Sequence, residues 1–149
     1  MNSLKYTFFL FFKLPSAFFC GVRLNSIDSS KSVVSIKHSW FNKNPYKSIF
    51  WAAQGMAAEL TTGSLLIKKI NQSGQNVSML VVENKSSFYK KATGKIIFQC
   101  NEGKKIQDLI NSLNQDNNKG IIELKSTGFD SDNIKVSEFS FTWSLKVRP

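Results

Sequence analysis

One glutamate stands alone in the most apolar stretch of the chain. Between Lys47 and Lys68, Glu59 is the only ionisable side chain, and its neighbours are mostly Ala, Leu, Ile, Phe and Trp. A carboxylate in such surroundings must be paired, hydrogen-bonded or neutralised by a raised pKa. Glu59 could simply reach solvent or cap a loop. It could instead align or deprotonate water, or attack an acyl carbon, and a thioester would suit it because a thiolate leaves with little help from an acid.

Other reactive residue types are few and scattered. The two cysteines, Cys20 and Cys100, form no CxxC pair and have no histidine at ligand spacing, so no metal site is expected. The single histidine, His38, shares one face of a predicted strand with Val34, Ile36 and the more distal Trp40. We therefore expect His38 to be a hydrogen-bonded interior side chain rather than a catalytic one.

The element that must position Glu59 is a helix predicted over residues 47–69. It is apolar nearly all round, which is typical of a helix buried in a core, and its Gln, Thr and Gly residues make a membrane span a poor fit. Its many alanines allow a sheet to wrap closely around it. The patterns predict further helices over 1–16 and 103–115, and strands over 17–26, 31–40, 76–83, 86–101, 119–128 and 133–148.

Together these elements predict an α+β fold in which a mostly antiparallel sheet packs on one central helix. The last strand is the clearest, because Phe139, Phe141 and Trp143 alternate with Ser and Thr. A length of 149 residues favours a single domain over 1–149. Within it, residues 1–16 form an N-terminal extension and residues 17–148 form the core.

The chain is strongly basic, with 20 Lys and Arg against 10 Asp and Glu. This charge indicates either an ordinary soluble surface or an anionic partner such as nucleic acid, acidic lipid or a phosphorylated cofactor. Only two arginines occur and no nucleic-acid motif is present, so a nucleic-acid partner is not expected.

The first residues resemble a signal peptide, with Lys5 followed by a Phe-rich run. Lys13 and Pro15 interrupt that run early, and no small-residue cleavage site follows. We therefore predict an N-terminal helix that caps the domain or packs on a partner subunit, in a cytoplasmic protein without membrane contact.

The segment from Asn44 to Glu59 resembles the core motif of hotdog-fold acyl-CoA thioesterases of the phenylacetic-acid-pathway and 4-hydroxybenzoyl-CoA type. That motif has an Asn, then His-Gly-Gly six residues later at the helix start, then an acid nine residues after the His. Here Phe50, Trp51 and Ala52 occupy the His-Gly-Gly positions, as in an uncharacterised bacterial branch of the clan. The resemblance spans 17–148 and is specific over 44–59.

The resemblance implies a hotdog fold and hydrolysis of an acyl-CoA, with no cofactor beyond the coenzyme A of the substrate. It implies a homodimer or dimer of dimers, with sheets joined edge to edge and two sites at the interface. Glu59 would be the base or nucleophile, assisted by Asn44, and the Trp51 and Ala52 N–H groups would polarise the thioester carbonyl. The implied substrate-binding residues are Tyr46, Phe50, Met56, Lys90, Lys91 and Lys95.

Three hypotheses remain open from the sequence. The first is a thioesterase that uses Glu59. The second is a hotdog module that binds an acyl or other apolar ligand without turnover, which the replaced His-Gly-Gly motivates. The third is a basic protein that docks on a membrane or nucleic acid through its Phe-rich N-terminal helix or its lysines.

Overall fold

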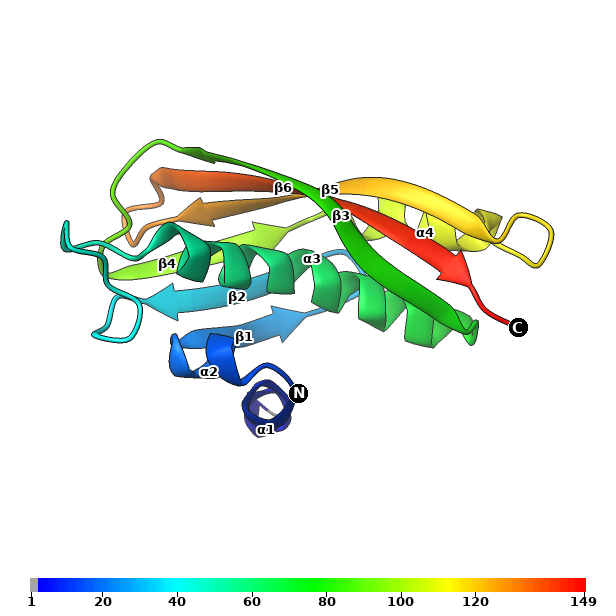
Figure 1. Ribbon diagram of the computed structural model, residues 1–149, viewed down its shortest axis with the longest axis horizontal. Coiled ribbons are helices and arrows are strands. Elements are labelled where there is room, and N and C mark those ends of the chain that lie inside the picture. The colour runs from blue at the N-terminus through cyan, green and yellow to red at the C-terminus, as the bar shows by residue number, and fades with distance from the viewer. Residues whose placement is uncertain (1–2) are drawn as a thin grey trace.

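The protein is described from a computed structural model that covers residues 3–149 (Figure 1). Four helices and six strands are present in this part of the chain. The helices are α1 (Ser3–Lys13), α2 (Pro15–Phe19), α3 (Trp51–Ser73) and α4 (Gly103–Ser112). The strands are β1 (Val22–Ile27), β2 (Ser32–Lys37), β3 (Val77–Phe88), β4 (Lys95–Cys100), β5 (Lys119–Phe129) and β6 (Lys135–Val147).

The six strands form one antiparallel sheet in the order β1-β2-β4-β5-β6-β3. The sheet curls around α3, which runs along its inner face, while α1 and α2 lie beside β1 (Figure 1). A bulge between Val81 and Glu83 in β3 adds to the bend of that edge. The expected α+β arrangement, an antiparallel sheet wrapped around a long central helix, is confirmed.

Helix α3 fits inside the sheet because its inner face combines small side chains with satisfied polar ones. Ala53, Ala57 and Ala58 are almost fully buried against the strands. Buried polar groups on the helix also bond to the sheet: Ser137 Oγ donates to Gln54 Oε1, Thr61 Oγ1 to Ser126 Oγ, and Trp143 Nε1 to Thr62 Oγ1. These bonds let a helix with polar residues stay buried without unpaired groups.

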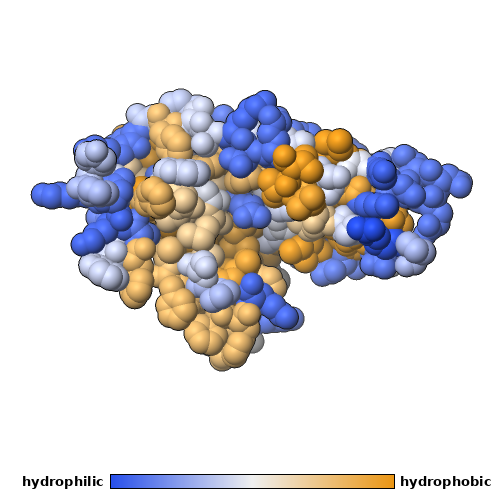
Figure 2. Space-filling model, viewed as in Figure 1, coloured by the Kyte–Doolittle hydropathy of each residue, from blue (hydrophilic) through white to orange (hydrophobic). Residues whose placement is uncertain are grey.

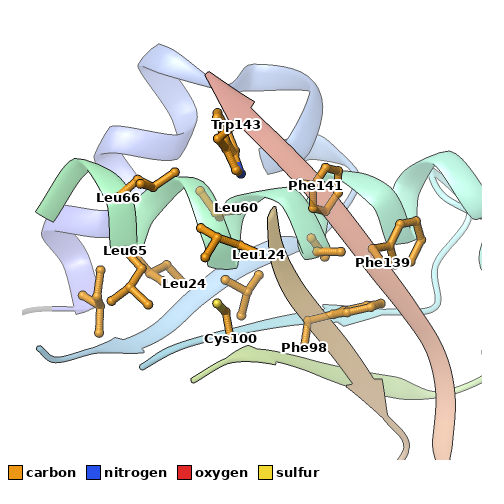
Figure 3. Close-up of a cluster of buried hydrophobic side chains, with 14 of the residues drawn as sticks. Leu24, Leu60, Leu65, Leu66, Phe98, Cys100, Leu124, Phe139, Phe141 and Trp143 are labelled. Atoms are coloured by element: carbon orange, nitrogen blue, oxygen red, sulfur yellow. The ribbon is translucent and has the colours of Figure 1, made fainter. Parts of the chain in front are cut away.

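The main core lies between α3 and the strands. Figure 3 shows Leu60, Leu65 and Leu66 of α3 near side chains from four different strands. Among those, Phe139 and Phe141 of β6 stack with parallel rings, 6.0 Å between centroids. The predicted alternation of β6 is therefore confirmed over residues 139–147: the apolar side chains are buried towards the helix, and the Ser and Thr side chains between them point away.

The predicted boundaries need several corrections. Residues 17–19 belong to helix α2 instead of a strand, and β2 ends at Lys37, so Trp40 lies in an exposed loop and not on the strand face with Val34. The predicted break between two strands near residue 85 is wrong, because β3 continues to Phe88 along β6. The connection between β3 and β4 instead covers residues 89–94 and ends at Gly94, whose φ is 69°. The helix predicted over 103–115 ends at Ser112.

The central and N-terminal helices are also shifted. Helix α3 begins at Trp51 rather than 47, because Lys47 adopts a left-handed φ of 61° within a loop, and it continues to a left-handed Gly74 cap. The N-terminal helix breaks at Leu14 into α1 and α2, since Pro15 begins a new helix there. Residues 1–2 of the predicted helix lie outside the described residues. Within residues 3–149, no helix has the length and apolar character needed to cross a bilayer.

Candidate functional site

A cavity of about 1060 Å³ lies between the N-terminal helices and the open face of α3. On the α3 side, its wall is a stripe of residues three and four apart, which places them on one face of the helix. The stripe consists of Met56, Glu59, Leu60, Gly63, Ser64 and Ile67. Tyr6 and Leu10 of α1 face it, Met79 and Trp143 close one end, and Lys5, Lys13 and Lys68 add positive charge.

The Glu59 carboxylate enters this cavity without a partner. Within residues 3–149 it forms no ion pair and no side-chain hydrogen bond, and only its backbone oxygen accepts a bond, from Thr62 Oγ1. Desolvation raises the pKa of Glu59 above the ordinary 4.5. The side chain is nevertheless solvent-accessible. Both facts fit a carboxylate that opens onto a cavity with mostly apolar walls, where water can enter but solvates the charge poorly.

A second, smaller pocket of about 560 Å³ lies at the N-terminus of α3. Most of the other predicted site residues line it, whereas Met56 and Glu59 do not. The predicted residues in this pocket are Asn44, Tyr46, Phe50, Trp51, Lys90 and Lys91. The structure thus divides the predicted site between two hollows along the same helix.

Asn44 organises the loop before α3. Its Oδ1 accepts the backbone N–H groups of Tyr46 and Ser48 at 2.9 and 3.2 Å, and its Nδ2 donates to Ser48 Oγ at 2.9 Å. This is an Asx-type turn that shapes the entry to the helix. The geometry makes Asn44 a residue that positions the loop backbone.

The first N–H groups of α3 are free, as helix geometry requires. Ala53 and Gln54 donate to the Phe50 carbonyl, but Trp51 and Ala52 have no acceptor among the described residues. These two donors point out of a helix N-terminus, where a developing negative charge is stabilised. Glu59 lies eight positions after Trp51, which places their Cα atoms about 12 Å apart along the helix axis. Within one chain, one small carbonyl group therefore cannot meet both.

The three predicted phosphate-binding lysines do not form one group. Lys90 lies in the second pocket and pairs with Asp130 at 2.5 Å, and this bond lowers the pKa of Asp130. Lys91 lines the same pocket and is exposed. Lys95 begins β4 opposite Lys37 and lines neither pocket.

His38 and the two cysteines line neither pocket. His38 Nε2 is buried without a hydrogen-bond partner in residues 3–149, so the expectation of a hydrogen-bonded interior histidine is wrong for this nitrogen. Burial raises the pKa of the Cys100 thiol to about 11, which keeps it protonated and unreactive. Within the same residues, no group of three His, Cys, Asp or Glu side chains could hold a metal ion.

Sequence reasoning missed the N-terminal helices as a wall of the Glu59 cavity. The sequence predicts an N-terminal helix that caps the domain or packs on a partner subunit, but nothing local indicates that Tyr6 and Leu10 would face Glu59. Contacts across some 50 residues of sequence leave no periodic signal within either segment. Lys68, which also lines the cavity, could have been found from the sequence, since it lies nine residues after Glu59 on the same predicted helix.

Comparisons with known proteins agree on the fold. No protein-family model matches the sequence, and no curated protein matches it significantly. Among solved structures, a Pseudomonas aeruginosa protein of unknown function described as a probable thioesterase is similar over 99% of this chain and 97% of its own, with 17% identity and a TM-score of 0.85. A Chlorobaculum tepidum protein of unknown function covers 98% and 94%, with 15% identity and a TM-score of 0.82.

A thioesterase from Haemophilus influenzae is also similar, over 99% of this chain and 92% of its own, at 7% identity and a TM-score of 0.70. At these identities the likeness defines the fold alone. The chain therefore has the hotdog fold, as the resemblance at residues 44–59 implied, and several of its structural neighbours are thioesterases.

Proposed function

We propose that the protein is an acyl-CoA thioesterase in which Glu59 is the general base or the nucleophile. The observation that carries the proposal is an unpaired carboxylate with a raised pKa in a large cavity of mostly apolar lining, on a fold whose structural neighbours include thioesterases. A site of this kind suits a substrate with a long apolar part and a reactive polar group. A cytoplasmic location, where acyl-CoA is available, belongs to the same proposal.

As a base, Glu59 would take a proton from water while the water oxygen attacks the thioester carbonyl carbon. The tetrahedral intermediate would then expel the thiolate, which recovers the proton from Glu59, and the acid is released. As a nucleophile, Glu59 would itself attack the carbon and expel the thiolate, and water would hydrolyse the resulting anhydride. In both routes the carbonyl oxygen gains negative charge, which the Trp51 and Ala52 N–H groups would stabilise.

The distance along α3 calls for two copies of the chain. Because Glu59 follows these two donors by eight and seven residues, about 10–12 Å along the helix axis, the donors would come from the partner subunit. Strand β3 is a sheet edge that pairs only with β6 in the described chain, and its Leu80 and Val82 are exposed. Pairing of two β3 edges would make a homodimer with two sites, and two such dimers could form a tetramer.

Substrate would then lie along the interface. The acyl chain would enter the cavity beside Met56 and Glu59. The second pocket of the partner subunit, which is lined by Asn44, Tyr46 and Phe50, would border the thioester. Lys91 and Lys90, in the loop after β3, would meet the phosphates of coenzyme A, with Lys95 at the start of β4 as a third basic residue.

The test is hydrolysis of short, long and aromatic acyl-CoA thioesters by the purified protein and by Glu59→Gln. We expect turnover of at least one class and a loss of roughly a hundredfold or more in Glu59→Gln, with an unchanged circular dichroism spectrum. Glu123→Gln, an exposed glutamate on β5, is the matched control and should keep full activity. Absence of turnover with every thioester would contradict the proposal.

The alternative is a hotdog module that binds an apolar ligand without turnover. The exposed rings of Phe50 and Trp51, which stand where the related motif has His and Gly, favour it because they occupy the approach to the helix N-terminus. This alternative predicts saturable binding of a fatty acid or acyl-CoA with no hydrolysis. Glu59→Gln would then change the affinity little.

A further inference from the structure

A group of aromatic side chains is exposed on α1, α2 and the loop after β2. Six rings make up this aromatic face: Phe11, Phe12, Phe18, Phe19, Trp40 and Phe41. Figure 2 shows apolar side chains gathered where α1 and α2 project from the body of the protein. A monomeric soluble protein rarely exposes a large contiguous apolar patch without a binding partner for it.

The rings touch one another across segments that are far apart in the sequence. Phe11 contacts Phe12 and Phe18 edge to face at 5.0 and 5.2 Å, and Phe19 meets Phe41 at 6.5 Å. The outermost members remain open, since Phe12 is 70% exposed and Trp40 is 74% exposed. The face is therefore one continuous surface built from three segments.

Helices α1 and α2 pack against the rest of the protein through other residues than the exposed rings. Helix α1 packs inward through Leu10, which is 1% exposed, and through the half-buried Tyr6. Ala17 does the same for α2. The aromatic face is on the opposite side. Of its six rings, only the half-buried Phe18 also packs against the core, and the other five are exposed.

Basic side chains lie beside part of the aromatic face, and few carboxylates occur in the same part of the chain. Residues 1–58 contain seven Lys and Arg and a single acid, Asp28. The Arg23 guanidinium lies over the Phe18 ring at 4.4 Å, and Lys43 Nζ lies 5.8 Å from the Trp40 ring. Arg23 also donates to the carbonyls of Phe18 and Val22, at 2.9 and 2.7 Å. Lys13 and Lys43 are exposed and form no ion pair with a carboxylate in the described chain.

Exposed rings with lysine and arginine at their margin match the interfacial zone of an anionic bilayer. There, amphipathic aromatic groups settle among the headgroups while basic side chains meet lipid phosphates. A protein partner would have to neutralise the same cations with acidic residues. A nucleic acid is less suitable, because the rings contact one another edge to face and leave no row of open faces for stacked bases.

We infer that the aromatic face docks the protein on the surface of a membrane containing anionic lipid. The rings of α1, α2 and the loop after β2 enter the headgroup region, and Lys13 and Lys43 bind lipid phosphates. Membrane or nucleic-acid docking is the third hypothesis left open by the sequence, which otherwise predicts no membrane contact. A single segment does not show that α1 and Trp40 form one surface. The inference stands whether or not Glu59 hydrolyses a thioester.

Co-sedimentation of the full chain with lipid vesicles tests the inference. We expect binding to phosphatidylcholine vesicles that contain about one third phosphatidylglycerol, and little binding to phosphatidylcholine alone. Raising the salt from about 0.1 M to about 1 M shortens the Debye length from roughly 10 to 3 Å and should release most of the protein. Equal binding to both vesicle types, or to neither, would overturn the proposal.

Matched variants separate this surface from the rest of the basic protein. Lys13→Gln with Lys43→Gln should weaken vesicle binding roughly fivefold for each charge removed, whereas Lys104→Gln with Lys119→Gln, exposed on other elements, should change it little. Phe12→Ser should weaken it roughly tenfold, and Ile121→Ser, equally exposed on β5, should not. If a control variant lost as much vesicle binding as its counterpart at the aromatic face, binding would not be specific to that face and the inference would be wrong.

Trp40 reports directly on whether this surface enters the lipid. On addition of anionic vesicles its fluorescence should shift to shorter wavelength, because the indole leaves water for the headgroup region. Trp40→Phe keeps the apolar surface, so it should bind vesicles but lose most of the shift. If Phe12→Ser instead changed the oligomeric state and Trp40 emission did not respond to vesicles, the aromatic face would be a protein interface and the inference wrong.

Discussion

The pKa of Glu59 is raised because its carboxylate is partly desolvated and has no bonding partner among the described residues. Its neighbours on the cavity wall include Met56, Leu60 and Ile67, and no described side chain donates a hydrogen bond to its carboxylate. Hydrogen bonds and cations lower carboxylate pKa values, as Lys90 does for Asp130. Glu59 lacks such a partner, so desolvation dominates and the carboxylate is a stronger base than an ordinary surface glutamate.

This environment predicts the pH dependence of the proposed activity. Both the base and the nucleophile role require ionised Glu59, so activity should rise with pH along a limb centred above 4.5, the ordinary glutamate value. The measurement is kcat/KM for the best thioester between about pH 4 and 8. Glu59→Asp keeps a carboxylate and should retain an acid limb. A wild-type limb centred below 4.5 would contradict a desolvated catalytic carboxylate.

Asn42, which the sequence did not single out, joins three segments near the start of α3. Its Nδ2 donates to the carbonyls of Cys20 and Lys37 at 2.8 Å, and its Oδ1 accepts the Ser39 N–H. Its backbone carbonyl accepts the Phe50 N–H at 2.7 Å. It is only 2% exposed, so water cannot replace these bonds if the side chain is lost.

We therefore expect Asn42→Ala to lower the free energy of unfolding by about 2–4 kcal/mol, from three lost hydrogen bonds and two unpaired carbonyls. Urea denaturation followed by circular dichroism measures it. Asn25→Ala, an exposed asparagine on β1, is the control and should change stability by less than about 0.5 kcal/mol. Similar small effects for both would show that the three segments hold together without this side chain.

At the scale of elements, glycine has different roles in two helices. In α3, a Cβ on Gly55 would sit 3.6 Å from the Phe139 ring, an ordinary contact. At the first residue of α4, a Cβ on Gly103 would overlap the Ser29 carbonyl oxygen and lie 2.7 Å from Ser30 Cα. The N–H of Gly103 also donates to the Ser30 carbonyl, so the backbone of α4 touches the β1–β2 turn directly.

The two glycines should therefore respond oppositely to alanine. Gly55→Ala should stabilise the protein by up to about 1 kcal/mol, because alanine favours a helix. Gly103→Ala should destabilise it by roughly 2 kcal/mol or more, because backbone atoms cannot move aside cheaply. Thermal unfolding of both variants under the same conditions tests the pair. Equal shifts in the same direction would mean that close backbone contact at Gly103 is unimportant.

The misplaced element boundaries have a common physical cause. Strand β3 continues past Glu83 because β6 supplies a partner strand up to Phe88, although the local sequence is polar and suggests a turn. Helix α3 starts late because Asn44 and the left-handed Lys47 stabilise a loop over residues that would otherwise suit a helix. Pairing partners and side-chain bonds from other segments override local preference at element ends.

For the whole molecule, the open edge of the sheet matters most. Strand β3 has 12 residues, and its outer edge is unpaired within the described chain. A long, exposed edge with apolar residues is a template for pairing with another copy. The proposed dimer would use this edge and bring the N-terminus of the partner's α3 towards Glu59.

If two β3 strands pair in this way, charged residues on the edge should separate the copies. Leu80→Lys with Val82→Lys would place like charges beside their symmetry equivalents, so we expect a shift from dimer to monomer and loss of thioesterase activity. Analytical ultracentrifugation over a range of concentrations measures the shift. Ile121→Lys, on the outer surface of β5, is the control and should leave the dimer intact. A monomeric wild-type protein would exclude this assembly.

The sequence by itself determined the central helix, the strand order along the chain, the alternation of β6 and the position of Glu59 as the one acid in that helix. These follow from local periodicity and from the cost of a lone charge among apolar residues. Only the tertiary structure decided that Glu59 opens onto a cavity walled by α1, that Asn44 and Phe50 border a different pocket, and that Trp40 joins the Phe-rich helices in one exposed surface. Those relations arise from contacts between distant segments, which local sequence patterns do not encode.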